Sequence, residues 1–366
     1  MNKSTKIFGL MAMILVTMQI LSCNDEPIIP IEEIKYDDTA YTLKYGGLPT
    51  PELPSDNELT IEGVKLGRML FYETLLSKNN KQSCATCHQQ KDGFSDLNRF
   101  SEGVEGKLGG RQAMPVFNMA WHNNGFFWDG RAPKLRDQSL KPIQDPLEMN
   151  ETLENVITKL KSNKAYVDQF KRAFVNAEIN ELNLSLALEQ FMFSIVSYES
   201  KYDKYLEGKT TLTEAEERGR KLFFTEFDPT GKEKGAECFH CHAGPNFTND
   251  EYMNNGLDAE IDFKDLGRAK VTMDNADHAR FLTPSLRNIE YTAPYMHDGR
   301  FQTLDEVIDH YNLGVKNSST VEFILQYNMQ PDGLKLNAQD KTDLLSFLKT
   351  LSDNSFLNNT AYSKPN

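Results

Sequence analysis

Most of the chain alternates between segments with a helical hydrophobic pattern and long polar loops. Between positions 182 and 206, apolar side chains recur every three or four residues, at Leu184, Leu188, Phe191, Ile195 and Tyr198. Residues 344–351 repeat this spacing, which places the apolar side chains on one face of a helix. The two-residue alternation that marks strands is scarce. The pattern therefore predicts an all-α fold with long loops.

The chain also contains an internal duplication. Residues 59–71 and 212–223 each carry a Thr followed by acidic residues and then Gly-Arg-x-Leu-Phe. A Thr cap with acidic residues in the first turn predicts a helix start, and the Gly in each lets another helix approach closely. Trp-Asp-Gly-Arg at 128–131 and His-Asp-Gly-Arg at 297–300 each precede an amphipathic stretch. We expect two similar helical domains, joined near residues 207–211.

The N-terminus has the layout of a targeting segment. Lys3 and Lys6 precede an apolar run over residues 7–20, which is short for a transmembrane helix and typical of a signal peptide. Ile-Leu-Ser-Cys, ending at Cys23, resembles the lipobox of bacterial lipoproteins. We interpret residues 1–23 as a lipoprotein-type signal peptide and residues 24–50 as a tether. A secreted protein with an incidental Cys23 is the alternative.

The remaining cysteines form two Cys-x-x-Cys-His motifs, at residues 84–88 and 238–242. This motif attaches c-type haem through two thioethers, and the adjacent imidazole reaches the iron. The predicted thioethers come from Cys84, Cys87, Cys238 and Cys241. The predicted proximal ligands are His88 and His242. A structural zinc site is a weaker interpretation because the two motifs lie far apart in the sequence. Disulfides are weaker as well because each Cys pair is followed directly by His.

The charge of the chain narrows the choice of partners. With 53 acidic and 40 basic residues, the formal net charge is −13. Nucleic acid is an unsuitable partner, because its binding requires clustered positive charge. A basic protein donor of electrons is compatible with this charge, although most of it serves to solvate the surface.

The chain resembles the bacterial di-haem cytochrome c peroxidase family, which includes the MauG-type oxidases. Besides both haem motifs, the resemblance rests on Phe-Trp-Asp-Gly-Arg-Ala (127–132), Pro-Ile (142–143), Pro-Leu-Glu-Met (146–149), Thr-Pro-Ser-Leu-Arg-Asn (283–288) and Ala-Pro-Tyr-Met-His-Asp-Gly (293–299). It implies two cytochrome c-like domains, each with one haem c. Residues 51–207 would form the peroxidatic domain, residues 208–355 the electron-transfer domain, and residues 356–366 a tail.

The resemblance also implies roles for the residues around the first haem. Glu148 matches the family's distal glutamate, a carboxylate that can move a proton between the two oxygens of hydrogen peroxide. Gln138 matches the distal glutamine, which orients the peroxide. Trp128 matches the tryptophan between the haems that helps electrons cross. Arg131 pairs either with a haem propionate or with an Asp.

One departure concerns the open face of the first haem. Family members that need reductive activation carry a histidine shortly after the first haem motif, where it covers the iron. Here Phe-Ser-Glu-Gly-Val-Glu-Gly fills positions 100–106, and no His occurs between His88 and His122. We therefore expect the first haem to be open without prior reduction. His122 is the one rival that remains for that position.

The second departure concerns the sixth ligand of the second haem. Many relatives carry a methionine fourteen residues after the His of Pro-Tyr-x-His, and this position is Tyr311 here, as in the MauG-like branch. A phenolate stabilises ferric and higher iron, whereas a thioether favours the reduced state. His310 is the main alternative, because a register error of one residue would exchange the two. Met296 is a weaker candidate.

The family also holds a calcium ion between its domains. The matching positions are Gln112, where relatives usually have Asn, and the backbone carbonyls of Thr292 and Pro294. Oxygen ligands of this kind suit Ca²⁺. The sequence assigns no role to His240 or His278.

These expectations together predict a peroxidase that reduces hydrogen peroxide to water. Its electrons would come from a small cytochrome c or cupredoxin in the periplasm or cell envelope. The membrane would be reached only through the lipid on Cys23, and a homodimer is compatible with the family. Two alternatives stay open: a MauG-like oxidase that modifies a partner protein, and a di-haem electron carrier without chemistry of its own.

Overall fold

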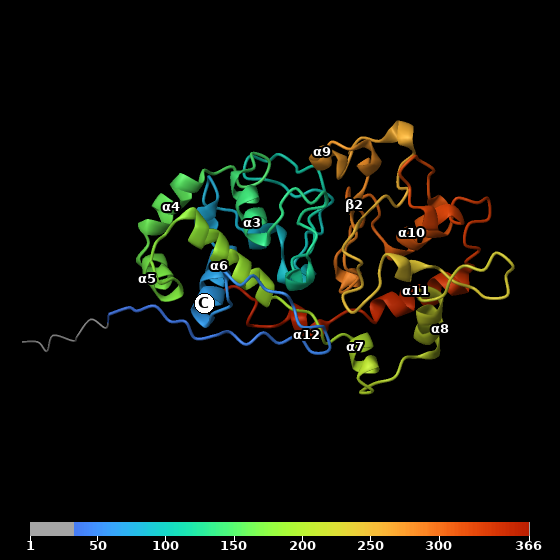
Figure 1. The fold of residues 1–366 in the computed structure, drawn as a ribbon, viewed down its shortest axis with the longest axis horizontal. Helices are drawn as coiled ribbons and strands as arrows, with labels where there is room; N and C mark the ends of the chain where they lie inside the picture. Colours follow the sequence, from blue (N-terminus) through green and yellow to red (C-terminus); the bar gives the residue numbers. More distant parts are fainter. Residues whose placement is uncertain (1–32, 366) are drawn as a thin grey trace, which may run out of the picture. The chain divides into compact units, whose positions relative to one another are not determined.

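The first half of the chain builds a lobe around two crossing helices, α1 and α6 (Figure 1). The structure, a computed structural model, describes residues 33–365, so the predicted lipidation at Cys23 lies outside the described residues. The helices of this N-terminal lobe are α1 (Ile61–Phe71), α2 (Cys84–Cys87), α3 (Leu135–Gln144), α4 (Leu153–Lys161), α5 (Lys164–Ala173) and α6 (Glu181–Ser194).

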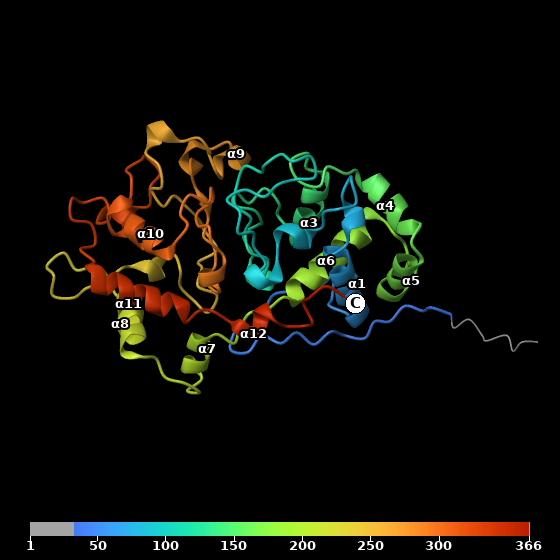
Figure 2. The same cartoon turned by 180° about the vertical axis from the view of Figure 1, so that it is seen from behind.

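The second half repeats this plan with α8 and α11 as the crossing pair (Figure 2). Its helices are α7 (Lys201–Leu206), α8 (Glu214–Phe223), α9 (Ala269–Thr272), α10 (Leu304–Asp309) and α11 (Ala338–Lys349). The strands are β1 (Tyr252–Met253) and β2 (Phe281–Leu282), which pair antiparallel. Each lobe has its own apolar core. The predicted mostly helical fold is confirmed, and none of the described helices is long and apolar enough to cross a bilayer.

The duplicated helix starts behave as the sequence predicts. The Thr60 side chain accepts a hydrogen bond from Gly63 N, and that of Thr213 accepts one from Glu216 N. A Cβ added at Gly67 would lie 1.9 Å from the carbonyl oxygen of Ala187 on α6. Glycine is therefore required because backbone meets backbone where the two helices cross.

Gly219 occupies the same place in the second lobe. A Cβ there would lie 1.9 Å from the carbonyl oxygen of Asp343 on α11. In both lobes, therefore, a glycine lets the first helix of the crossing pair contact the backbone of the second, and the sequence repeat reflects a repeat in structure.

The predicted helix over 182–206 is interrupted. α6 ends at Ser194, and α7 begins again after Ser200, which forms a capping box with Asp203. Between them the Asp353 carboxylate accepts hydrogen bonds from Tyr198 N and Glu199 N (both 3.0 Å). These backbone groups bond to a distant side chain instead of to a helical turn, so the lobes meet at this extended segment.

Described residues of the predicted tether and of the predicted tail contact the N-terminal lobe. Residues 24–50 were predicted as a tether, but Leu48 is buried and Tyr41 N donates to the carbonyl of Leu59 (2.9 Å). Residues 356–366 were predicted as a tail, but Phe356 and Tyr362 are buried in the N-terminal core. The segment with α12 (Asn354–Leu357) therefore returns to the first lobe, because its aromatic side chains complete that core.

Replacing Gly67 by Ala should lower the free energy of unfolding by about 1–3 kcal/mol, because the added methyl forces the α1–α6 crossing apart. The change would be measured as a lower urea midpoint of the haem-loaded protein. Gly47, which has no atom within 4 Å of an added Cβ, supplies the control Gly47→Ala. An equal midpoint for both variants would contradict the close crossing.

Candidate functional site

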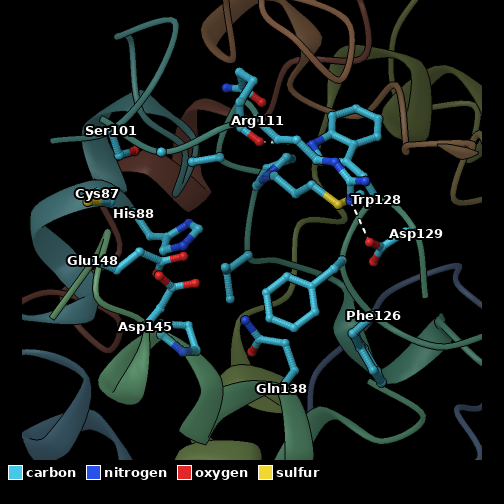
Figure 3. A pocket seen from close by; sticks show the side chains of 18 of the residues that line it. Cys87, His88, Ser101, Arg111, Phe126, Trp128, Asp129, Gln138, Asp145 and Glu148 are labelled. Atoms are coloured by element: carbon cyan, nitrogen blue, oxygen red, sulfur yellow. Dashed lines mark hydrogen bonds and ion pairs between the residues drawn. The ribbon is translucent and has the colours of Figure 1, made fainter. Parts of the chain in front are cut away.

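The first Cys-x-x-Cys-His motif forms a helical turn at the wall of a cavity of about 430 Å³ (Figure 3). We call this space, lined by Cys87, His88 and Glu148 among others, the N-terminal cavity. His88 Nδ1 lies 3.0 Å from the carbonyl oxygen of Phe94, and Phe94 has a positive φ of 57°. A carbonyl only accepts, so Nδ1 carries the proton and Nε2 keeps its lone pair for a ligand bond.

The second motif repeats this arrangement. His242 Nδ1 lies 3.2 Å from the carbonyl oxygen of Phe247, whose φ is also positive at 52°. Cys238, Cys241 and His242 line a second cavity, which we call the C-terminal cavity. The orientation of the imidazole is thus part of the repeat.

The donor set at both cavities fits a covalently bound haem. Four thiols, two at each motif, are all free among the described residues. Burial lowers the pKa of His88 and lowers that of His242 to about 4, so both imidazoles are neutral at pH 7 and able to bind iron. Paired thiols beside a neutral imidazole and an apolar cavity are what haem c attachment requires.

One face of α3 forms a wall of the N-terminal cavity. Leu135, Gln138 and Pro142 stand three and four residues apart and all line the cavity, as the helical repeat requires. The Gln138 side chain makes no hydrogen bond to another described residue, which leaves its amide available to a small ligand.

A tight turn after α3 places Glu148 in the same cavity. Asp145 Oδ1 accepts from Leu147 N (2.8 Å), and Glu148 N donates to the carbonyl of Asp145 (3.0 Å). Figure 3 shows the carboxyl groups of Glu148 and Asp145 on the same side of the cavity. Burial and then the charge of Asp145 raise the pKa of Glu148 to about 7, against the opposing effect of Arg131. Near neutral pH this carboxyl group can both accept and donate a proton.

The segment over residues 100–106, which contains no histidine, packs directly against this turn. Val104 N donates to the carbonyl oxygen of Glu148 (2.8 Å), and a Cβ at Gly103 would lie 2.1 Å from the carbonyl oxygen of Leu147. His122 lines the cavity, but its Nδ1 lies 2.8 Å from Asp250 Oδ1. That contact holds the imidazole against the second lobe.

Trp128 lines both cavities and is held at both ends. Its Nε1 donates to the carbonyl of Gln112 (2.8 Å), and its own carbonyl accepts from Leu282 N (2.8 Å). The side chain is buried and packs with Phe281. The indole therefore has one fixed position between the two cavities.

A charged cluster beside Trp128 joins the lobes. Arg111 contacts Asp129 (2.7 Å) and Asp265 (2.7 Å), one from each half of the chain. Arg131 contacts Asp129 (3.0 Å) and lies over the Phe127 ring. The structure thus shows the Asp pairing for Arg131, one of the two alternatives that the sequence left open.

Tyr311 lines the C-terminal cavity together with His242 and Met296. Its hydroxyl accepts from Asn255 Nδ2 (3.2 Å). His310 is buried but does not line the cavity, and its Nε2 donates to the Asn255 carbonyl (3.1 Å). Residues 310–314 form a π-helical turn, which changes the register locally and separates the two neighbouring side chains.

The three residues predicted to bind calcium, Gln112, Thr292 and Pro294, line the C-terminal cavity and are buried. Gln112 Nε2 donates to Ser95 Oγ (3.0 Å) and to the carbonyl of Asp96 (3.3 Å). The side-chain nitrogen is thus engaged, and the side-chain oxygen is the atom left to bind an ion. The carbonyl of Gln112 already accepts from Trp128.

Comparison with known proteins gives consistent results. A family model described as di-haem cytochrome c peroxidase matches residues 61–211. The methylamine utilization protein MauG of Methylorubrum extorquens is 36% identical over 81% of this chain and 80% of its own length. The cytochrome c551 peroxidase of Nitrosomonas europaea is 34% identical over 79% of each.

Solved structures agree with these sequence matches. A MauG-like protein associated with microbial copper homeostasis is 32% identical and covers 87% of this chain and 97% of its own, with a TM-score of 0.77. The di-haem peroxidase BthA from Burkholderia thailandensis, at 21% identity and a TM-score of 0.68, supports the fold alone; it covers 91% of this chain and 98% of its own.

Sequence reasoning missed the groups that join the lobes around the site. Arg111, Asp265 and Asp250 carry no local motif, and the Arg111–Asp265 and His122–Asp250 pairs join residues more than a hundred positions apart. The sequence contains one signal for Arg111: it directly precedes Gln112, which was predicted to bind calcium between the domains.

Replacing Asp145 by Asn should lower the pKa of Glu148, because it removes a negative charge but keeps the oxygen that accepts from Leu147 N. Infrared difference spectra at stepped pH would follow the protonated carboxyl band that Glu148→Gln abolishes. We expect a midpoint near pH 7 in the unmodified protein and a lower one in the variant. An unchanged or higher midpoint would contradict the coupling.

Proposed function

Because this chain belongs to the di-haem cytochrome c peroxidase family, we propose that it is a peroxidase that reduces hydrogen peroxide to two waters with two protons and two electrons. The observation that carries this proposal is the convergence of Glu148, Gln138 and His88 on one cavity. An electron carrier has no use for an acid and an amide in the cavity of its proximal histidine.

The residues that would hold the two haems follow from the repeat. Thioethers would form at each pair of thiols, and His88 and His242 would bind iron through Nε2, since Nδ1 of each is bound to a carbonyl. Bound haem would supply the iron that binds peroxide and the electrons that break its O–O bond.

The protein's own contribution is to move and orient protons. Glu148, as a carboxylate, would take a proton from one oxygen of hydrogen peroxide and return it to the other, which leaves as water. The remaining oxygen would become the second water with two protons and the two electrons from the donor. The raised pKa of Glu148 makes both transfers favourable near neutral pH. The Gln138 amide donates a hydrogen bond that holds the peroxide in line with this carboxyl group.

Electrons would enter through the C-terminal lobe and cross at Trp128, which borders both cavities. We assign Tyr311 as the sixth ligand of the second haem, because it lines the cavity whereas His310 does not. A calcium ion held by the Gln112 side chain and the carbonyls of Thr292 and Pro294 would fix the lobe junction next to Trp128.

The external donor would be a small cytochrome c or a cupredoxin, and its basic surface would suit a chain with a net charge of −13. We place the protein in the periplasm or cell envelope, lipid-anchored at Cys23. A homodimer fits this assignment.

A MauG-like oxidase is the second candidate. Two observations favour it: no histidine occurs between His88 and His122, and Tyr311 lines the C-terminal cavity. Such an enzyme would draw its electrons from side chains of a partner protein and modify them. Peroxide-dependent formation of a modified residue on a co-purified protein would identify it, whereas turnover with reduced cytochrome c alone would identify the peroxidase.

Replacing Glu148 by Gln should reduce peroxide turnover by about 100- to 10,000-fold, because the amide cannot move the proton. Steady-state oxidation of a reduced donor would measure this loss. Glu154→Gln, an exposed glutamate on α4, is the matched control and should keep full activity. Unchanged turnover in Glu148→Gln would remove this residue from the mechanism, whereas no peroxide turnover in the unmodified protein would favour an electron carrier.

Replacing Tyr311 by Met should raise the midpoint potential of the second haem, because a thioether stabilises reduced iron and a phenolate stabilises oxidised iron. Spectroelectrochemical titration measures the change. His310→Gln, which keeps a donor for the Asn255 carbonyl, should leave the potential unchanged. The opposite outcome, a shift in His310→Gln alone, would reverse the ligand assignment.

A further inference from the structure

A cluster at the edge of the C-terminal cavity brings together Glu226, Glu237 and His240. One possible ligand atom from each lies within 4.8 Å of the other two, and His240 Nε2 is 3.0 Å from Glu226 Oε2. His240 is the second variable residue of the Cys-x-x-Cys-His motif at 238–242. Neither haem attachment nor peroxide chemistry uses these three side chains.

The cluster stands on an ordered loop that follows α8. Glu237 N donates to the Thr225 carbonyl (3.2 Å), and Glu237 Oε1 accepts from Phe227 N (3.1 Å). Gly235 makes this closure possible, because an added Cβ would lie 2.1 Å from the carbonyl oxygens of Thr225 and Glu226. The two glutamates are therefore held where residues 225–227 and 235–237, the two ends of one loop, lie side by side.

One oxygen of the cluster lacks a partner. Glu237 Oε2 is buried and makes no hydrogen bond to any described residue. A buried carboxylate oxygen without a donor is costly, and a cation bound beside it would remove this cost. Glu226, by contrast, is largely exposed, so solvent can reach the cluster and an ion can enter.

We propose that Glu226, Glu237 and His240 bind a divalent transition-metal ion at the surface of the C-terminal lobe. One imidazole and two carboxylates form a donor set that suits Zn²⁺ or Cu²⁺, whereas Ca²⁺ and Mg²⁺ prefer oxygen alone. Three protein ligands leave a fourth position for water or an external group. The three ligand atoms, which lie within 4.8 Å of one another, would have to move closer together on binding.

The site would connect metal binding to the second haem. His240 lies between Cys238 and Cys241, and Glu237 also lines the C-terminal cavity. An ion there would link the two ends of the loop, at Glu226 and Glu237, to the turn that carries His240. It would also add positive charge beside the C-terminal cavity. The inference does not depend on the proposed peroxidase activity, because an electron carrier with the same loop would bind the ion equally.

Isothermal titration of the untagged, haem-loaded and chelator-treated protein with Zn²⁺ tests the proposal. We expect saturable binding of one ion, weakened about 10- to 100-fold or more in Glu226→Gln and in His240→Ala, since even partners of metal ligands contribute that much. Glu226→Gln changes an exposed loop residue and guards against misfolding of the motif. The haem spectrum confirms that each variant is loaded.

His278→Ala is the matched control, because His278 lies outside the cluster and its loss should leave the isotherm unchanged. Absence of saturable Zn²⁺ binding in the unmodified protein would overturn the proposal. So would binding that persists at full strength in both Glu226→Gln and His240→Ala, because the ion would then lie elsewhere.

Discussion

A hydrogen bond from an imidazole Nδ1 to a backbone carbonyl sets the direction of each candidate iron ligand. His88 makes it to Phe94 and His242 makes it to Phe247, in both cases a phenylalanine with positive φ. The bond fixes the tautomer and presents Nε2 to the cavity. Glu148 and Gln138 line the same cavity as His88, so the direction of Nε2 decides where a ligand held by this imidazole would lie relative to the acid and the amide.

The two lobes share a plan but have diverged in what faces the imidazole. In the first lobe, Gln138 and Glu148 line the cavity and contribute groups that move or orient protons. In the second, Tyr311 and Met296 line it and contribute possible ligands. Trp128, fixed by backbone hydrogen bonds on both sides, borders both. Two cavities with different lining groups and an aromatic ring that borders both suit a division between chemistry and electron supply.

The sequence predicted the parts of this arrangement that depend on local pattern. Helix caps at Thr60 and Thr213 and the glycines at the helix crossings follow from short motifs, and the structure confirms them. The resemblance to a family supplied Glu148 and Gln138, which a pattern of single residues could not have brought to one cavity. Proposing Tyr311 over His310 needed the lining of the C-terminal cavity, which includes Tyr311 but not His310.

What the sequence could not predict depends on contacts between distant segments. The break after α6 exists because Asp353 binds the backbone there, and the C-terminal segment returns because Phe356 completes the first core. The bond of His122 to Asp250 likewise spans the two halves of the chain. Such pairings have no local signature, since either partner alone resembles an ordinary surface residue.

We propose that the first haem has an open face without prior reduction, because the loop over residues 100–106 offers no histidine and His122 is bound to Asp250. A low-temperature EPR spectrum of the fully oxidised protein would distinguish an open face from a covered one. An open face gives one high-spin and one low-spin ferric haem, which is the result we expect. Two low-spin signals would refute the proposal, because an internal ligand would then cover the face that Glu148 and Gln138 are proposed to serve.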